Sequence, residues 1–419
     1  MKGADTRKLN DQSDRRAFRT LDRMENNSLR RNVEDNNDVK DSCVNLKNSI
    51  PLLKELFYMH RKVGEGAFSS VFLATLKSSS GHKKFALKHL IPTCHPERIE
   101  RELQCLQQIG GKDYIVGLEL CLRNRGSVVF VMPYMRHDRF SEYCKDMTVE
   151  ETKGYMRALL SALRRVHKFN IIHRDVKPSN FLYDRANRRY LLVDFGLAQQ
   201  YTAENLKTIK ETNMESVEVP TIRQKKSDEN NLNLQPDSAS RRHVSNKCYC
   251  FGKAKVCTLC LTRPQQAAPR AGTPGFRAPE VLLKHPSQTS AIDIWASGVM
   301  MLCILSGTQP FFRSPDDCTA LAEITSIFGS YQVQQCAQKL GKKVIFSENL
   351  PGIDLMSLCL KLQKRNRSMT YDSEHNTYKK VSSNIEYPKE AYHLLTKLLD
   401  LDYKTRITAE QALSHPFLS

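Results

Sequence analysis

The sequence predicts an α+β protein of two lobes, in which a small antiparallel sheet with one helix precedes a larger, mainly helical part. Two patterns lead to this prediction. Between Leu56 and Tyr134, short apolar runs alternate with turns and with one amphipathic helix, as is typical of a sheet lobe. After Met135 the apolar residues recur at helical spacing. We therefore expect a sheet lobe at 51–135 and a helical lobe at 136–419.

The expected elements follow from these patterns in chain order. In the sheet lobe, strands are expected at 57–66, 69–77, 83–90, 117–124 and 127–135, with the helix at 97–109. In the helical lobe, the clearest helices are 148–169, 279–285, 292–307 and 389–400. Thr148 is followed three residues later by Glu151, a capping box that predicts where the first of these helices begins.

Three stretches do not fit this pattern. Residues 1–50 are rich in Asn, Asp, Arg and Lys and are expected to form a disordered tail, since they bury too little apolar area to offset ordering entropy. Residues 203–246 and 335–386 have a similar composition and are expected to be insertions in the helical lobe. The second insertion starts with some helical periodicity, so the loop is expected in its later half.

Composition excludes several classes of protein. The chain has 419 residues, of which 40% are hydrophobic, and its Gly and Pro contents are ordinary, which excludes collagen-like and wholly disordered chains. The sequence shows neither a secretory signal nor a long apolar run, so we expect an intracellular protein without a membrane partner. A formal net charge of +19 favours anionic partners, or simply reflects a generally basic surface.

Four of the thirteen cysteines form a cluster within residues 248–260: Cys248, Cys250, Cys257 and Cys260. Four thiolates paired at both ends of a short loop suit a closed, tetrahedral zinc site with a structural role. The alternatives are free thiols that cluster by chance, or a site in which His243 replaces one cysteine. The other cysteines are expected to be reduced, because the number is odd and no secretory signal is present.

A glycine-rich turn is expected to approach phosphate oxygens with its backbone N–H groups. By itself the pattern is weak, because a GxG turn is usually an ordinary hairpin. Lys88 strengthens it, since a lysine on the following buried strand needs an anionic partner such as a phosphate. The residues of the turn are Val63, Gly64, Glu65, Gly66, Ala67, Phe68, Ser69, Ser70 and Val71.

The helix after Lys88 offers two acids, Glu100 and Glu102. At 100° per residue, Glu102 lies nearer the apolar stripe of that helix, so it is predicted to pair with Lys88. The alternative is that both acids are solvated surface charges.

The segment 172–180, with sequence IHRDVKPSN, places an acid, a cation and a carboxamide on one short loop. Phosphoryl transfer needs a carboxylate to orient a hydroxyl, which Asp175 supplies, and a cation near the transferred group, which Lys177 supplies. It also needs oxygen ligands for Mg²⁺, for which Asn180 and Asp194, the first residue of a DFG triplet, are suited. These residues predict ATP and Mg²⁺ as cofactors.

Three further motifs complete an ordered series: Ala278-Pro279-Glu280, Asp293-Ile294-Trp295 and Arg406. From about residue 51 to the end, the chain resembles the eukaryotic protein kinase superfamily. The resemblance implies a bilobal kinase fold and an internal ion pair between Glu280 and Arg406. It also implies Met132 as the gatekeeper, with Pro133, Tyr134 and Met135 as the hinge against adenine.

Lys177, two positions after the aspartate, and the segment Gly272-Thr273-Pro274 resemble the serine/threonine branch of this superfamily. In that branch the threonine at the position of Thr273 bonds to the catalytic aspartate and lysine. The alternative for Thr273 is an activation phosphosite.

The insertion with its cysteine cluster, followed by PRAGTPGFR at 269–277, resembles the cell division cycle seven-related kinases. The segments FALKHL, ELQCL, HRDVKPSNFL and VDFGLAQ fit the same family. The resemblance implies a regulatory activator subunit, replicative helicase subunits as substrates at the start of DNA replication, and a location in the nucleus. Short basic runs such as Arg223 to Lys226 are compatible with that location.

Arg270 and Arg277 flank the segment that in kinases faces the residue after the phosphoacceptor. Two guanidiniums there predict a preference for a carboxylate or phosphoserine at that position. The alternative is that Arg277 braces the helical lobe and Arg270 is solvated.

Other classes of function stay open at this stage. The chain fits another cell-cycle serine/threonine kinase less well, and the intact catalytic positions argue against a pseudokinase scaffold. A zinc-dependent nucleic-acid binder is suggested by the charge and the cysteines, but with little aromatic interleaving we do not expect nucleic-acid binding as the main activity.

Overall fold

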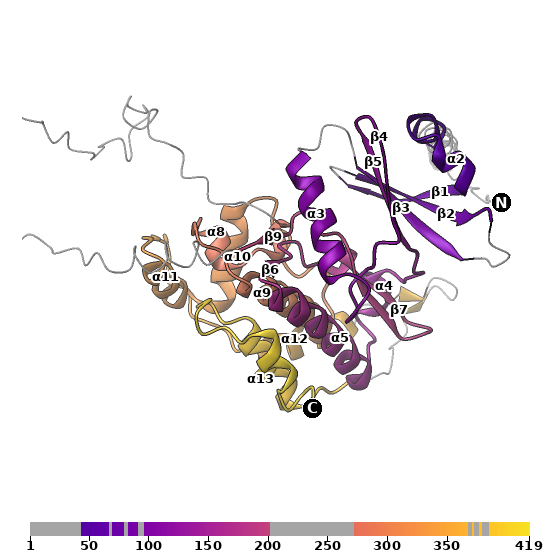
Figure 1. Ribbon diagram of the computed structural model, residues 1–419. Helices are drawn as coiled ribbons and strands as arrows, with labels where there is room; N and C mark the ends of the chain where they lie inside the picture. Colours follow the sequence, from indigo (N-terminus) through magenta and orange to yellow (C-terminus); the bar gives the residue numbers. More distant parts are fainter. Residues whose placement is uncertain are drawn as a thin grey trace, which may run out of the picture.

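The computed structural model describes residues 43–66, 69–78, 83–90, 96–201, 272–367, 371–372, 377–378 and 385–419. These residues form a small sheet lobe, here called the N-lobe, and a larger helical lobe, the C-lobe, joined after β5, as the sequence predicts (Figure 1). No helix among them is long and apolar enough to cross a membrane.

The sheet of the N-lobe has the strand order β1-β2-β3-β5-β4, and all neighbouring strands are antiparallel. Helix α3, the longest one among the described residues of this lobe, lies beside the sheet and faces the C-lobe (Figure 1). Its bounds are Pro96–Ile109, and the strands are β1 (Phe57–Gly66), β2 (Ser69–Leu76), β3 (Lys84–Leu90), β4 (Leu120–Asn124) and β5 (Ser127–Pro133). This arrangement confirms the predicted strands and helix.

The end of the predicted tail is part of the fold. Residues 43–49 are helical, and α2 (Leu52–Leu56) follows them beside β1 and β2 (Figure 1). Leu46, Ile50 and Leu53 are buried in a cluster with Phe57, Phe72 and Phe85 of the sheet. The prediction of disorder to residue 50 was therefore wrong for 43–50, because a few apolar residues at helical spacing find a partner in the sheet.

The C-lobe is built around α9 (Ala291–Ser306), whose residues from Ile292 onward are all buried. A helix that is apolar on every side belongs in the centre of a domain, and α5 (Val149–Lys168), α12 (Leu355–Arg367) and α13 (Lys389–Leu398) contact it. The other helices that the structure describes in this lobe are α4 (Phe140–Tyr143), α8 (Pro279–Leu282), α10 (Asp317–Phe328), α11 (Ser330–Lys339) and α14 (Ala409–Leu413), with the 3₁₀ turns η1 (Pro178–Asn180) and η2 (Pro274–Phe276).

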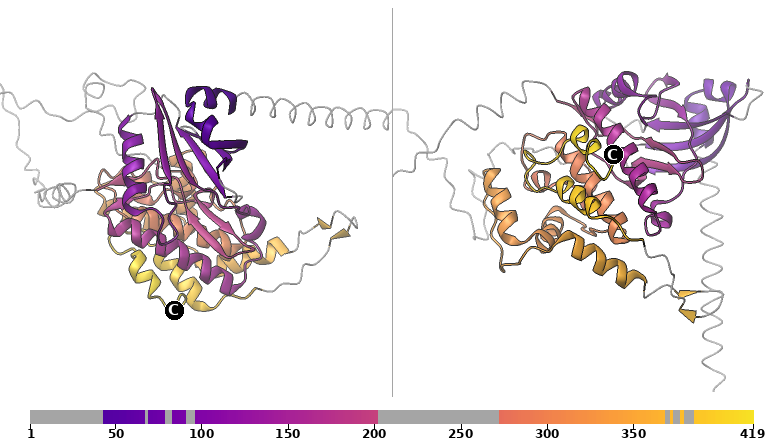
Figure 2. Two further views of the ribbon diagram at one scale, coloured as in Figure 1. Left: turned by 45° about the vertical axis from the view of Figure 1, so that its right-hand side comes forward. Right: turned by 90° about the horizontal axis from the view of Figure 1, so that it is seen from below.

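Short strand pairs complete the C-lobe. One pair, β7 (Phe181–Asp184) with β8 (Arg189–Leu192), follows the segment 172–180 directly. The other pairs are β6 (Ile171–Ile172) with β9 (Gln199–Gln200), and β10 (Tyr371–Asp372) with β11 (Thr377–Tyr378). The pair β10–β11 stands apart from the helices of the lobe (Figure 2).

The expected insertion at 335–386 contains more structure than its composition indicates. Helix α12 lies within it, with Leu355 and Cys359 buried, and Gln363 Nε2 donates to the carbonyl of Leu305 in α9 at 2.6 Å. The helical residues before 361 agree with the periodicity seen in the sequence, whereas the expectation of a loop in the later half was wrong for 361–367, which complete α12. Contacts with α9 such as that of Gln363 extend the helix through these mostly polar residues. The first insertion, 203–246, and residues 1–42 lie outside the described residues.

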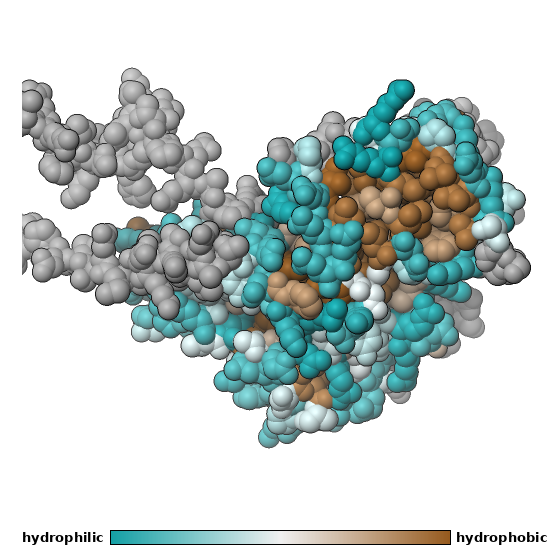
Figure 3. Space-filling view, viewed as in Figure 1, coloured by the Kyte–Doolittle hydropathy of each residue, from teal (hydrophilic) through white to brown (hydrophobic). Residues whose placement is uncertain are grey.

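Apolar side chains gather on the surface of the N-lobe, next to α3 and over β4 and β5 (Figure 3). A groove of about 860 Å³ lies there between the end of α3 and β4. Its lining is mixed, with Gln107 and Glu119 beside the apolar residues Leu106, Leu120 and Cys121. Leu120 is 40% exposed.

Candidate active site

Lys88 joins the two lobes at the centre of the candidate site. It lies on β3 and is 5% exposed, and its Nζ donates to Glu102 of α3 and, at 2.7 Å, to Asp194 Oδ1. Glu102 is 3% exposed, whereas Glu100 is exposed, so the predicted choice of Glu102 is confirmed. A buried ammonium with two carboxylate partners is fixed in position.

Lys88 and Asp194 keep their charges, whereas burial raises the pKa of Glu102 above its ordinary value. Burial disfavours the ammonium of Lys88, but Glu102 and Asp194 outweigh burial and raise its pKa above the ordinary value. Burial also acts on Asp194, but Lys88 outweighs it and lowers the pKa of this carboxyl to about 2. Asp194 is therefore ionised at neutral pH, with Oδ1 on Lys88 and 44% of its side chain exposed.

Asp175 lies at the centre of the second group and is 8% exposed. Its Oδ1 accepts from the hydroxyl of Thr273 at 3.0 Å, and its Oδ2 accepts from Asn180 Nδ2 at 3.0 Å and pairs with Lys177 Nζ at 2.8 Å. Lys177 Nζ also donates to Thr273 Oγ1 at 2.9 Å. The bonds of Thr273 that the resemblance implies are present, although Thr273 is distant in sequence from its two partners.

Asp293 holds the backbone of the loop that carries Asp175. This carboxylate is 1% exposed and accepts from the backbone N–H groups of His173 and Arg174, each at 2.8 Å. Arg174 has a φ of 69°, which is unfavourable for a side chain of this size. Burial raises the pKa of Asp293, but His167 and the bonds from His173 lower it below the ordinary value, so the carboxylate stays charged.

His173 completes this support. Its ring is buried, with Nε2 3.1 Å from the carbonyl of Val193 and Nδ1 accepting from the N–H of Asp175 at 3.3 Å. It thus links the loop of Asp175 to the segment that carries Asp194. No role for His173 or Asp293 was predicted from the sequence. The signal for them was that His173 lies in the segment 172–180 and that Asp293 begins the motif Asp293-Ile294-Trp295.

Asn180 and Asp194 are suited to Mg²⁺. Asn180 is 6% exposed, and its Nδ2 donates to the carbonyl and carboxylate of Asp175, which leaves its Oδ1 as an acceptor. Oδ2 of Asp194 has no hydrogen-bond partner among the described residues. An amide oxygen and an ionised carboxylate, together with phosphate oxygens, form a donor set that Mg²⁺ prefers.

The glycine-rich turn and the hinge have the positions that the sequence predicts. Gly64 pairs with Val71 and Gly66 with Ser69 across β1 and β2, while Ala67 and Phe68 at the tip lie outside the described residues. The segment from Met132 to Met135 leads from β5 into the C-lobe, and the N–H of Tyr134 donates to the carbonyl of Lys84.

Arg277 is engaged within the protein. Its Nη1 donates to Asp317 Oδ1 at 2.5 Å, its Nη2 donates to the carbonyl of Gly272 at 2.6 Å, and its side chain is 11% exposed. These bonds match the alternative in which Arg277 braces the helical lobe, and they do not leave its guanidinium free. Arg270 lies outside the described residues.

The pair between Glu280 and Arg406 confirms an implied contact. Arg406 Nη1 and Nη2 donate to the two oxygens of Glu280 at 2.7 and 3.0 Å, and both side chains are almost fully buried. This bidentate bond joins α8 to the start of the last helical segment.

The zinc prediction falls on residues that the structure does not describe: Cys248, Cys250, Cys257, Cys260 and His243. Within the described ranges, no group of three or more His, Cys, Asp or Glu side chains is placed to hold a metal ion. The zinc site therefore rests on the sequence alone.

Comparison with known proteins agrees with this geometry. The model of the protein kinase domain matches residues 57–216 and 242–418, so the chain is a protein kinase. It is 36% identical to the human Cell division cycle 7-related protein kinase, over 90% of this chain and 92% of that protein. It is 33% identical to the Drosophila melanogaster non-specific serine/threonine protein kinase Cdc7, over 91% and 77% of the two chains.

A third relative is also similar over most of both chains. The chain is 32% identical to the Cell cycle protein kinase spo4 of Schizosaccharomyces pombe, over 89% of this chain and 88% of that protein. The chain belongs to the Cdc7-related serine/threonine protein kinases.

Proposed function

We propose that this kinase is the catalytic subunit of an activator-dependent enzyme that phosphorylates replicative helicase subunits at the start of DNA replication. The support is the similarity to Cdc7-related kinases over most of the chain, together with the intact catalytic groups around Asp175 and Lys88. A nuclear location belongs to the same proposal. Fluorescence microscopy of the tagged chain tests the location, and an exclusively cytoplasmic signal throughout the cell cycle would contradict it.

The single observation that carries the catalytic proposal is the group of bonds around Asp175. Its carboxylate is held by Thr273, Lys177 and Asn180 beside the nucleotide site, so it can orient a substrate hydroxyl and take its proton. Lys177 supplies positive charge next to the same carboxylate, where the transferred phosphoryl group would lie. Lys88 would bind the α- and β-phosphates of ATP, with Glu102 holding it in place.

When bound, Mg²⁺ neutralises charge on the phosphates of ATP. Asn180 and Asp194 would hold it through the oxygens described above, and Met132 to Met135 would face adenine. The test is transfer of labelled phosphate to helicase-subunit peptides by the purified chain, with and without a co-purified partner. Wild-type transfer by an Asp194→Ala variant would contradict this assignment.

The activator is proposed to cover the N-lobe surface beside α3, where apolar side chains gather in Figure 3. The groove there and the exposed Leu120 on β4 support this position. Leu120→Glu should abolish co-purification of the partner, whereas Tyr331→Glu, a 72% exposed residue on α11, should not. Equal recovery of the partner with both variants would place the activator elsewhere.

We also propose a preference for an acidic residue after the phosphoacceptor, read by Arg270 and Arg277. Since Arg277 already bonds to Asp317, a substrate carboxylate would have to compete with Asp317 for it. Asp317→Asn should therefore increase the ratio of kcat/KM for a Ser-Glu peptide to that for a Ser-Ala peptide, and Arg270→Ala should decrease it. If neither variant changes the ratio, the arginines do not read this position.

The cysteine cluster is proposed to bind a structural zinc ion. Cys257→Ser together with Cys260→Ser leaves two thiolates, too few for a tetrahedral site. We expect about one equivalent of zinc in the wild-type protein by elemental analysis and none in the double variant, with the kinase lobes still folded. A wild-type chain without zinc would contradict the proposal.

A further inference from the structure

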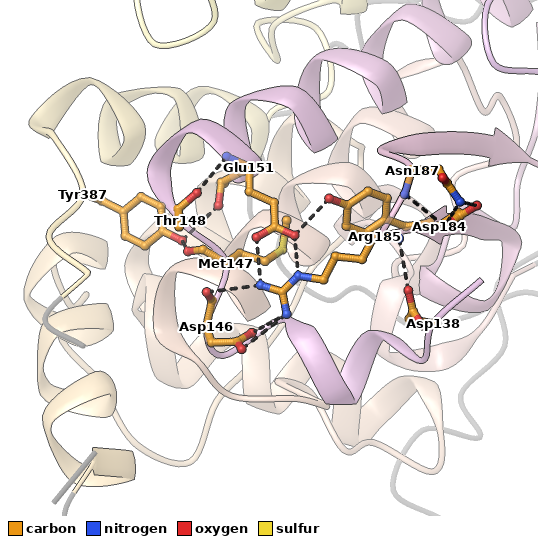
Figure 4. Close-up of polar contacts among 11 residues, drawn as sticks. Asp138, Asp146, Met147, Thr148, Glu151, Asp184, Arg185, Asn187 and Tyr387 are labelled. Atoms are coloured by element: carbon orange, nitrogen blue, oxygen red, sulfur yellow. Dashed lines mark hydrogen bonds and ion pairs between the residues drawn. The ribbon is translucent and has the colours of Figure 1, made fainter. Parts of the chain in front are cut away.

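Arg185 lies in the turn between β7 and β8, and its guanidinium bonds to two other segments (Figure 4). Nε and Nη2 donate to the two oxygens of Glu151 on α5, at 2.7 and 2.9 Å. Nη1 donates to the carboxylate of Asp146, which precedes α5, at 3.1 Å. The planar fork of arginine allows all of these bonds at once, which lysine cannot do.

Glu151 is committed to this contact. Its side chain is 8% exposed, and its Oε1 also accepts from the hydroxyl of Tyr183 on β7 at 2.9 Å. Thr148 accepts from the N–H of Glu151, so this half of the predicted capping box is present. The carboxylate of Glu151, however, is used by Arg185 and Tyr183, and it therefore ties the start of α5 to β7.

The backbone of Arg185 makes a third connection. Its N–H donates to Asp138 Oδ2 at 3.0 Å, and the N–H of Asp138 donates to the carbonyl of Tyr183 at 2.9 Å. Asp138 follows the hinge, three residues after Met135. These two bonds fasten the segment that leaves the hinge to the end of β7.

The other end of β7 is at the active site. The strand begins at Phe181, directly after Asn180, and the N–H of Val193 donates to the carbonyl of Asn180 at 2.8 Å. One strand of four residues thus connects the hinge segment to the proposed Mg²⁺ ligand. Loosening the Arg185 end would let the hinge move relative to Asn180.

We propose that Arg185 and Asp138 are positioning residues for the nucleotide: they fix the hinge relative to Asn180, so that one ATP molecule engages both. Neither residue needs to contact ATP. The inference rests on the proposed nucleotide site, and its consequence is specific. A ligand that contacts only the hinge should bind independently of Arg185 and Asp138, whereas a ligand that spans hinge and metal site should not.

The test uses the full chain and direct binding, so it does not depend on catalytic activity. Asp138→Ala removes the acceptor for the N–H of Arg185, and Asp138→Asn is the matched control because its Oδ1 can still accept. We expect Asp138→Ala to weaken binding of a non-hydrolysable ATP analogue with Mg²⁺ about tenfold, and binding of adenosine less than about twofold, by calorimetry. Asp138→Asn should change neither by more than about twofold.

A second variant tests the guanidinium of Arg185 by removing it together with its buried partner, so that no buried charge is left unpaired. Arg185→Met combined with Glu151→Gln removes both charges together, and it should also weaken the ATP analogue more than adenosine. A purely structural role would lower the fraction of protein that binds, or the melting temperature, without changing the Kd of either ligand. Unchanged Kd values, or equal weakening of both ligands, would overturn the inference. If the wild-type chain binds neither ligand, the nucleotide site itself is wrong.

Discussion

The predicted role of Asp175 in phosphate transfer depends on one atom, its carboxylate oxygen Oδ2. Its Oδ2 faces two donors, Lys177 and Asn180, so an amide nitrogen in that place would meet only N–H groups. Asp175→Asn should lower the rate of phosphate transfer by about 10²- to 10⁴-fold while the Kd for ATP stays close to wild type. Rapid-quench measurement of transfer and calorimetry with an ATP analogue check both parts. Transfer within a factor of a few of wild type would contradict the role of Asp175.

Thr273 bridges Asp175 and Lys177 through one hydroxyl. Thr273→Ala removes both bonds and should lower kcat about tenfold, because Lys177 and Asp175 each lose one of the bonds that hold them in position. Thr273→Ser keeps the hydroxyl and is the matched control. If Thr273 were a phosphosite that activates the enzyme, Ser would restore activity only in a phosphorylated sample. Phosphatase treatment before the kinetic assay therefore separates the two roles.

The site residues that could be predicted from the sequence are those that residue type and local spacing identify. Glu102 could be chosen over Glu100 because the helical stripe is a local pattern. The position of Asp293 could not be predicted in the same way. Asp293 supports the catalytic loop by accepting hydrogen bonds from the N–H groups of His173 and Arg174, about 120 positions earlier. Such a contact exists only after the C-lobe has folded.

At the scale of elements, regular helices and strands were predictable because their apolar periods are long. The helix at 43–49 and α2 were missed because each is too short to show a helical period, α2 having only five residues, three of them leucines. Their stability comes from packing on the sheet and not from helix propensity. The same explanation holds for the last part of α12, residues 361–367, which are mostly polar and in which Gln363 bonds to the carbonyl of Leu305 in α9.

The packing of α2 can be measured. Leu53 is fully buried against the sheet, whereas its neighbour Leu52 is 42% exposed. Leu53→Ala should lower the free energy of unfolding by about 2 to 5 kcal/mol, while Leu52→Ala should change it by less than about 0.5 kcal/mol. Urea unfolding followed by circular dichroism gives both values. Equal effects of the two substitutions would show that α2 does not pack as described.

The pair of Glu280 and Arg406 joins elements far apart in the chain. Removing one partner leaves the other charge buried and unpaired, so Glu280→Ala should destabilise the protein by about 3 to 5 kcal/mol. Glu280→Gln keeps hydrogen-bond acceptance with less loss and is the control. If thermal unfolding shows the Ala variant to be as stable as the wild type, the pair of Glu280 and Arg406 is not needed to hold α8.

At the scale of the whole molecule, the two lobes meet in the bonds of Lys88. This side chain on the N-lobe bonds to Glu102 of the same lobe and to Asp194 of the C-lobe. The order of the motifs predicted which groups would meet. The pair of Lys88 and Glu102, which fixes the ammonium that would bind the phosphates of ATP, is formed among the described residues.

Dependence on an activator is therefore expected to concern catalysis more than nucleotide binding. With the pair Lys88–Glu102 already formed, a partner that acts on the segment after Asp194 should leave the Kd for ATP within about threefold. If the competent arrangement is a minor state of about 10% or less in the chain alone, the partner should raise kcat about tenfold or more. Calorimetry and peptide phosphorylation, each with and without the partner, measure the two effects. Tighter ATP binding in proportion to the gain in rate would instead mean that the partner acts on α3, because Glu102 is the residue through which α3 holds Lys88.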